Sequence, residues 1–265
     1  MWGASFVLMK DAIKRQEVNS FLFTRFLIAA LVMFLINPRV SKRITKDLLT
    51  KGFLAGCFLA AGYIFQTLGL ARTTAAVTGF LTGLYVIFTP LIAAVLLRHK
   101  ITIRTWLIVA IATIGLGFLS IHGWSIGPGE LLVLLSAIAY AAHFISLGQW
   151  SSGRDAYAMT IIQLATCALI TGVISLGQGY QPPPDIGVWG VVIFTAVFAT
   201  ALAFMVQTWS QAHMTPTRVA VILTTEILFA AGFAIWFGGE RLTFQLSIGG
   251  ILVVIAMYMM VIQEA

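Results

Sequence analysis

Charge is the scarcest property of this sequence. Only 9% of its 265 residues are Asp, Glu, Lys or Arg, whereas 60% are hydrophobic. A soluble domain carries roughly 25% charged residues, so a chain with this few could not cover its surface in water. The composition therefore predicts an integral membrane protein that is in contact with the lipid bilayer along most of its length.

Several motifs that the sequence lacks exclude classes of function. The two cysteines, Cys57 and Cys167, both lie inside apolar runs, so no disulfide or metal framework is predicted. The sequence has no glycine-rich phosphate loop and no clustered His, Cys or Asp spacing. We therefore expect no cofactor, no ATP hydrolysis and no enzymatic activity. The net charge of +7 lies mostly between apolar runs, which indicates membrane orientation and not nucleic-acid binding.

The apolar runs predict helices that cross a membrane, each of which needs about 20 mostly apolar residues. The first predicted segment is too short to span, which indicates a natural start upstream of Met1 or a truncated first helix. A signal peptide is the weaker interpretation, because no basic region precedes Trp2 and no small-residue cleavage site follows it. The predicted segments are 1–12, 19–37, 52–71, 73–97, 103–121, 130–150, 157–178, 187–210, 215–238 and 245–263.

An internal repeat organises these segments. A shift of 141 residues places Gln66-Thr67 on Gln207-Thr208 and aligns the charged turns at 98–102 and 239–243. We therefore expect two domains, 1–127 with helices one to five and 128–265 with helices six to ten. Because five is odd, the second copy enters the membrane from the opposite side. The predicted fold is an all-α membrane protein of ten transmembrane helices in two inverted five-helix repeats, typical of secondary transporters.

Basic residues in the loops predict the orientation. The loops on the side of the N-terminus hold ten basic residues and the opposite loops hold five, which places both termini in the cytoplasm. The first set is Arg39, Lys42, Arg43, Lys46, Lys51, Arg98, Lys100, Arg104, Arg154 and Arg218, and the second is Lys10, Lys14, Arg15, Arg72 and Arg241.

Burying a charged side chain inside a membrane segment costs free energy, so such residues are candidates for a functional site. Glu226 lies in the middle of the ninth segment, where it could bind a substrate amine or a proton, or else hold helices together through hydrogen bonds. Its partner in the repeat is Tyr85. Arg25 lies a third of the way into the second segment, and its stem could snorkel to the surface or its cation could pair with another helix. The functional alternative for Arg25 is to hold a substrate carboxylate, or to take part in charge pairing or ion coupling with Glu226.

Polar and aromatic residues at helical spacing predict a central cavity. Thr78, Thr82, Tyr85 and Thr89 form one stripe of a helix, and His143 lies mid-way along the sixth segment. Such stripes could line a cavity or form hydrogen bonds between helices, and a lone histidine is often only a packing residue. We predict a substrate-binding cavity lined by Trp2, Ser5, Tyr63, Gln66, Thr82, Tyr85, Tyr140, His143, Gln207 and Glu226. Pairs of glycines at Gly52 and Gly56, and at Gly115 and Gly117, indicate close helix contacts instead.

Several short motifs, in their order and spacing, resemble the EamA branch of the drug/metabolite transporter superfamily over nearly all of the chain. They are Trp2-Gly3-Ala4-Ser5-Phe6, Arg25-Phe26-Leu27, Thr89-Pro90, Glu226-Ile227-Leu228-Phe229-Ala230-Ala231 and Gly239-Glu240-Arg241-Leu242-Thr243. The chain departs from the family at Ile227, where a proline is common, and at His99, where a glutamate is preferred. The resemblance implies ten helices in two inverted repeats, cytoplasmic termini, a bacterial inner membrane and export of small metabolites.

The sequence thus predicts a secondary transporter that exports an amino acid, an amine or a drug-like compound by alternating access. An uncoupled facilitator remains an alternative, as does a membrane-embedded enzyme or a lipid-handling protein. An enzyme would need a convergent nucleophile, base or metal set, and none is visible in the sequence. The sequence leaves open the substrate, the direction of transport, proton coupling and whether the chain forms a homodimer.

Overall fold

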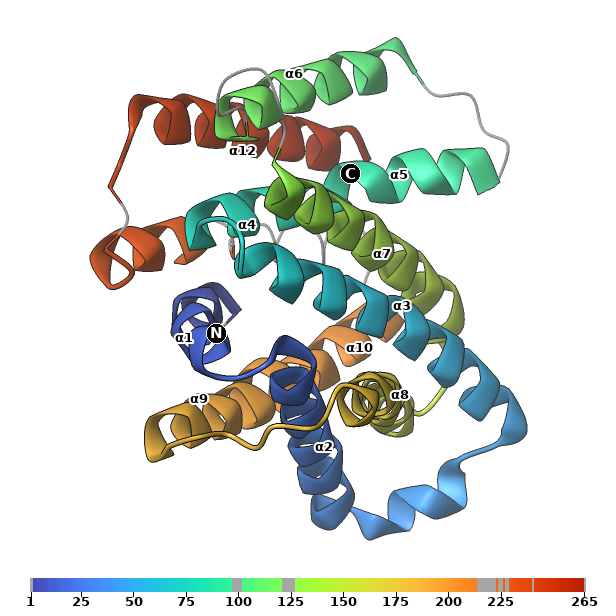
Figure 1. Ribbon diagram of the computed structural model, residues 1–265. Coiled ribbons are helices and arrows are strands. Elements are labelled where there is room, and N and C mark those ends of the chain that lie inside the picture. The colour runs from blue at the N-terminus through green and yellow to red at the C-terminus, as the bar shows by residue number, and fades with distance from the viewer. Residues whose placement is uncertain are drawn as a thin grey trace.

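Helices make up all the regular secondary structure in the described part of the chain (Figure 1). The computed structural model describes residues 2–96, 102–120, 127–213, 223, 226, 229–239 and 241–264. Its helices are α1 (Trp2–Arg15), α2 (Val18–Ile36), η1 (Pro38–Arg43), α3 (Lys46–Leu70), α4 (Ala75–Thr82), α5 (Tyr85–Leu96), α6 (Ile103–Ser120), α7 (Pro128–Trp150), α8 (Ala156–Gly177), α9 (Ile186–Ala196), η2 (Val197–Leu202), α10 (Ala203–His213) and α12 (Phe244–Glu264).

Six helical spans in the described residues are long and apolar enough to cross a membrane. They are Val18–Ile36, Lys46–Leu70, Ala75–Val95, Pro128–Trp150, Ala156–Gly177 and Ile186–His213, and shorter apolar helices cover Ile103–Gly115 and Phe244–Met260. All of them fall within or close to segments predicted from the sequence. The predicted ninth segment, 215–238, is described mainly by a helical stretch at 229–236, and its start at Thr215 lies outside the described residues.

Polar contacts fix α2 and α8 side by side in opposite directions. Ser20 and Ser175 hydroxyls lie 2.8 Å apart near the start of α2 and the end of α8. At the other end of the pair, the Tyr157 hydroxyl donates to the Met33 carbonyl, and Arg43 forms a 2.9 Å ion pair with Asp155. Because both ends of the pair are joined, these two helices run antiparallel along their whole length.

Glycines let α3 approach its neighbours closely. A Cβ on Gly56 would lie 2.6 Å from Thr166 on α8, and one on Gly62 would lie 2.6 Å from the Tyr140 ring on α7. The predicted close contacts at Gly52, Gly56 and Gly115 are confirmed, since Gly115 brings α6 against Leu252 of α12. In Figure 1, α6 and α12 lie next to each other, apart from the α2–α8 pair.

The predicted segment over 73–97 corresponds to the span Ala75–Val95, but a break at Gly83 and Leu84 separates α4 from α5 within it. Around the break, backbone amides bond three residues back instead of four, from Leu84 to the Leu81 carbonyl and from Val86 to the Gly83 carbonyl, both at 3.1 Å. Glycine is common in membrane helices, so Gly83 alone gave no signal of a break.

A second irregularity interrupts the span from Ile186 to His213. Residues Val197–Leu202 form a π-helical turn, η2, between α9 and α10. The sequence predicted an uninterrupted helix over 187–210. A π turn accommodates one extra residue within an α-helix and occurs often at functional sites. The backbone and side-chain groups of η2 are therefore candidates for a functional role.

Candidate functional site

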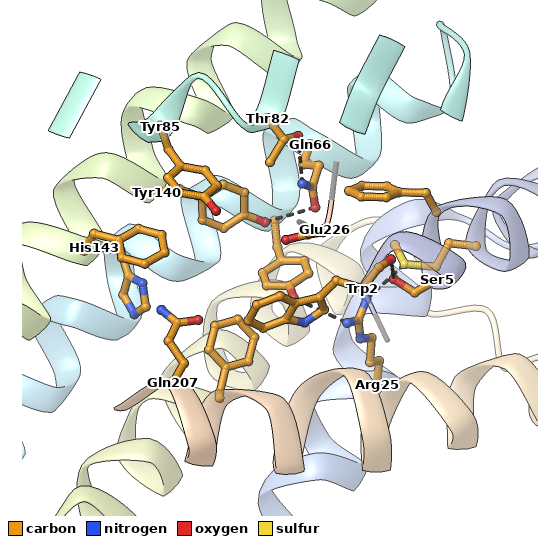
Figure 2. Close-up of a pocket in the computed structure, with 15 residues that line it drawn as sticks. Trp2, Ser5, Arg25, Gln66, Thr82, Tyr85, Tyr140, His143, Gln207 and Glu226 are labelled. Carbon is orange, nitrogen blue, oxygen red and sulfur yellow. Dashed lines mark hydrogen bonds between the residues drawn. The ribbon is translucent and has the colours of Figure 1, made fainter. Parts of the chain in front are cut away.

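A cavity of about 50 Å³ lies where α1, α2, α3, α4, α5, α7 and α10 meet Glu226 (Figure 2). By this measure it has room for a few water molecules, so a metabolite would require the surrounding helices to move apart. Its wall consists of Trp2, Ser5, Phe6, Met9, Arg25, Tyr63, Gln66, Thr82, Tyr85, Tyr140, His143, Phe144, Phe204, Gln207 and Glu226.

The structure brings the predicted site residues together. All ten side chains predicted to line a cavity do so, and Arg25 joins them. Their role in binding a substrate stays a prediction. The sequence reasoning missed three apolar members, Met9, Phe144 and Phe204, because an apolar residue has no contrast in so apolar a chain. Phe204 lies three residues before Gln207, and that helical spacing is the signal that could have found it.

Both polar atoms of the Gln66 side-chain amide form hydrogen bonds. Its Nε2 donates to the Thr82 hydroxyl at 3.0 Å, and its Oε1 accepts from the Tyr140 hydroxyl at 3.0 Å. The three side chains come from α3, α4 and α7. Since Thr82 ends α4 just before the break, this chain of hydrogen bonds fixes the broken helix against α3.

Arg25 is fully buried, so the predicted snorkelling to the surface is wrong and the alternative of bonds between helices is confirmed. Its Nε donates to the Thr200 hydroxyl at 2.7 Å, and an Nη atom lies 3.4 Å from the Ala199 carbonyl oxygen. Both acceptors belong to the π turn. Trp2 donates its indole N–H to the same Ala199 oxygen at 2.6 Å. The π turn thus anchors α1 and α2 to the cavity wall.

The remaining contacts of the Arg25 guanidinium are weaker. One nitrogen faces the Met9 sulfur at 3.0 Å, and another lies 3.4 Å from the Tyr63 hydroxyl, with the Tyr63 ring centre 4.9 Å from the guanidinium carbon. A thioether is a weak acceptor, so the buried cation retains hydrogen-bonding capacity on its Met9 side.

His143 is buried on α7, and one of its ring nitrogens is partnered. Its Nε2 lies 2.7 Å from the Gln163 Oε1, and the Gln163 amide nitrogen donates to the Met159 carbonyl at 3.1 Å. The other nitrogen, Nδ1, is buried without a hydrogen-bond partner among the described residues. The burial of His143 fits a packing residue, and its Nδ1 atom has capacity for a further partner.

The family comparison matches this helical chain to the EamA-like transporter family over residues 1–121 and 127–262. The chain belongs to that family. As an EamA-like transporter it is an integral membrane protein that takes part in transport.

Relatives of this EamA-like transporter carry transporter names as well. An uncharacterized transporter from Archaeoglobus fulgidus is 29% identical over 97% of this chain and 80% of its own length. The pseudopaline exporter CntI of Pseudomonas aeruginosa is 23% identical over 94% of this chain and 88% of its own length. A solved crystal structure with 14% identity covers 99% of this chain and 94% of its own, with a TM-score of 0.71, and supports the fold.

The cavity wall of this EamA-like transporter combines hydrogen-bonding groups with aromatic rings. The Tyr85 and Phe144 rings stack with centroids 4.7 Å apart, and Tyr63 meets Tyr140 edge to face at 5.7 Å. Glu226, half-buried, adds a carboxyl group to the same wall. No cluster of metal-ligating side chains occurs among the described residues.

Two of the four residues in the predicted polar stripe do not reach the cavity. The Thr78 hydroxyl donates to the Thr74 carbonyl and the Thr89 hydroxyl to the Tyr85 carbonyl, each within its own helix. The break between α4 and α5 lies in the middle of the stripe, and only Thr82 and Tyr85, which flank it, line the cavity. For Thr78 and Thr89, the hydroxyls bond to the backbone of their own helix, which is neither the cavity lining nor the hydrogen bonding between helices that the sequence predicted.

Proposed function

We propose that this chain is a secondary transporter that exports a small organic metabolite, such as an amino acid, an amine or a drug-like compound, by alternating access. The observation that carries the proposal is the cavity, in which polar groups from the first half, such as Gln66 and Arg25, face His143, Gln207 and Glu226 from the second half. A site between two halves is open to either side of the membrane in turn if the halves rock about it.

The antiparallel α2–α8 pair supports an arrangement of ten helices in two inverted repeats, 1–127 and 128–265. These helices are the second of each proposed half. The loop after α2 is joined to the loop before α8 by Arg43 and Asp155, whereas the loop after α8 is joined to the loop before α2 by Asp185 and Arg15. Corresponding loops therefore lie at opposite ends of the pair, as inversion requires.

The same ion pairs agree with the orientation expected from loop charge. The basic residues Arg43, Lys51 and Arg154 gather with Asp47 and Asp155 at one end of the bundle, and Arg15 lies at the other. By the positive-inside rule we propose that the first end faces the cytoplasm, the side expected for both termini. A bacterial inner membrane is the location that we propose for the protein.

Flux into liposomes tests the function. Purified protein is reconstituted, and a panel of radiolabelled amino acids, amines and cationic drugs is screened with and without a pH gradient. Flux of at least one solute above protein-free liposomes is expected, and flux of none would contradict a transporter of this class.

Glu226 is the proposed coupling group, and Glu226→Gln tests it. If Glu226 carries a proton across, the variant loses the acceleration by a pH gradient and keeps exchange of solute at equal pH. Glu130→Gln is the matched control, because Glu130 is a buried carboxyl that accepts a hydrogen bond from Thr73 outside the cavity. A pH response in Glu226→Gln equal to that of the control would rule out Glu226 as the coupling group, and a wild-type flux that does not respond to the gradient would indicate an uncoupled facilitator.

A further inference from the structure

We propose that the Nδ1 atom of His143 accepts a hydrogen bond from the ammonium group of the substrate. The proposal rests on the proposed transport function and specifies its substrate class: a solute with N–H donors on its cationic group. The same cation without N–H donors would bind less well.

The first step is the proton on the ring. Gln163 donates its amide nitrogen to the Met159 carbonyl, so its oxygen faces His143 Nε2 at 2.7 Å. A carbonyl-type oxygen can only accept, so Nε2 carries the ring proton. In the neutral ring Nδ1 is then a bare acceptor, and a protonated ring would leave an N–H donor equally without a partner.

The second step is the position of the bare nitrogen. His143 is 1% exposed, and Nδ1 has no hydrogen-bond partner among the described residues. Leaving a buried polar atom unpaired costs free energy, so such an atom in a native protein usually has a bound water, ion or ligand as its partner. His143 lines the cavity, and the Gln207 side chain points toward it (Figure 2).

The cavity wall also favours a positively charged group on the ligand. Glu226 brings a carboxyl group to the wall, and the ring faces of Tyr85 and Phe144 flank the His143 side of the cavity. Carboxylates and aromatic faces both attract cations. Arg25 lies on the far side of the cavity from His143 in Figure 2, with a thioether as one of its acceptors. A zwitterion with its ammonium at His143 and its carboxylate toward Arg25 fits this distribution.

The test compares two probes that differ in N–H donors while sharing their charges: phenylalanine and N,N,N-trimethylphenylalanine. Binding of each to detergent-purified protein is measured by isothermal titration calorimetry. Wild-type protein is expected to bind phenylalanine about tenfold more tightly, the effect of leaving one buried acceptor unpaired.

Two variants of His143 distinguish the roles of its two ring nitrogens. In His143→Asn the side-chain amide takes the place of Nδ1, whereas in His143→Gln it takes the place of Nε2 and keeps the contact with Gln163. The preference for phenylalanine is expected to persist in His143→Asn and to fall about tenfold in His143→Gln. Comparing ratios between proteins cancels the difference in size between the probes.

Every other outcome overturns the proposal. An unchanged preference in His143→Gln, a loss in both variants, a loss in His143→Asn alone, or no binding of phenylalanine to wild-type protein each contradicts it. Flux of other solutes in liposomes would meanwhile leave the transport function intact, so the two failures are distinguishable.

A measurement on the wild-type protein covers the case in which a variant does not fold. Nitrogen-15 NMR of histidine-labelled protein in lipid reports each ring nitrogen of His143. Phenylalanine is expected to move the Nδ1 signal toward that of a hydrogen-bonded acceptor, and the trimethyl probe is expected to leave it in place. Equal movement with both probes, or none with either, overturns the proposal.

Discussion

The span that carries Gln66 and the span that carries Gln207 begin alike and then differ by one residue. Thr45 and Asp185 each cap a helix by accepting a hydrogen bond from the backbone amide three residues on, of Leu48 and of Val188. These caps are 140 residues apart, whereas Gln66 and Gln207 are 141 apart. One extra residue therefore lies between cap and glutamine in the second span, and the π turn η2 is where it is accommodated.

The extra residue has consequences for the cavity. The π turn presents Ala199 and Thr200 to Arg25, whereas α3 runs without interruption. The glutamines differ as well: Gln66 has short hydrogen bonds to Thr82 and Tyr140, but among the described residues Gln207 has one long contact of 3.4 Å to Gln211. We therefore expect Gln66 to belong to a fixed wall of the cavity and Gln207 to be available to a ligand.

Removing the extra residue should have the largest effect. Deletion of Phe198 from the π turn would restore a regular helix, rotate the residues beyond it and withdraw the acceptors from Arg25. Loss of two hydrogen bonds to a buried cation should cost on the order of 3 kcal/mol. Thermal unfolding in detergent measures it, with the lipid-facing substitution Phe198→Ala as control. A deletion variant as stable as this control would show that the π turn is dispensable.

An intermediate effect is expected from the glutamines themselves. Gln66→Leu leaves the Tyr140 and Thr82 hydroxyls without their partner, so stability should fall by about 2 kcal/mol. Gln207→Leu should change stability by less than about 1 kcal/mol, yet weaken solute binding. Unfolding temperature and KM for flux, measured on both variants, give the two readouts. Equal losses of stability in the two variants would remove the distinction between wall and ligand site.

The smallest effect concerns the two caps. The backbone amide of Val188, together with the nearby Arg15 cation, lowers the pKa of Asp185 below its ordinary value. A lowered folded-state pKa stabilises the fold above the ordinary carboxyl pKa, and this contribution is lost as the pH falls through the lowered value. Asp185→Asn should therefore flatten the acid side of the stability profile slightly. Thr45→Ser should not, since that cap does not titrate, and unfolding temperatures between pH 7 and pH 3 compare the two.

Helical spacing explains why so many cavity residues could be predicted from the sequence. Polar side chains such as Gln66 and His143 stand out in an apolar chain, and the cost of burying them in lipid predicts that they face inward. The contact glycines Gly52 and Gly56 were equally visible. The sequence did not predict that Arg25 would stay buried, because snorkelling and bonding to another helix are both open to a long side chain.

The two helix irregularities escaped prediction for different reasons. Gly83 breaks a helix here, but glycine is frequent in unbroken membrane helices as well. The π turn has no residue signature of its own. What the sequence does show is a difference in spacing: the caps Thr45 and Asp185 are 140 residues apart, whereas Gln66 and Gln207 are 141 apart. That mismatch can be recognised only when the caps are known.

The polar contacts at both ends of α2 and α8 also offer a reference for measuring motion. Spin labels placed on the lipid-facing sides of Leu31 on α2 and Leu169 on α8 would keep a single separation throughout a transport cycle, because Ser20 with Ser175 and Arg43 with Asp155 hold the two helices in register. Distances from this pair to labels on other helices would then identify which parts of the bundle open.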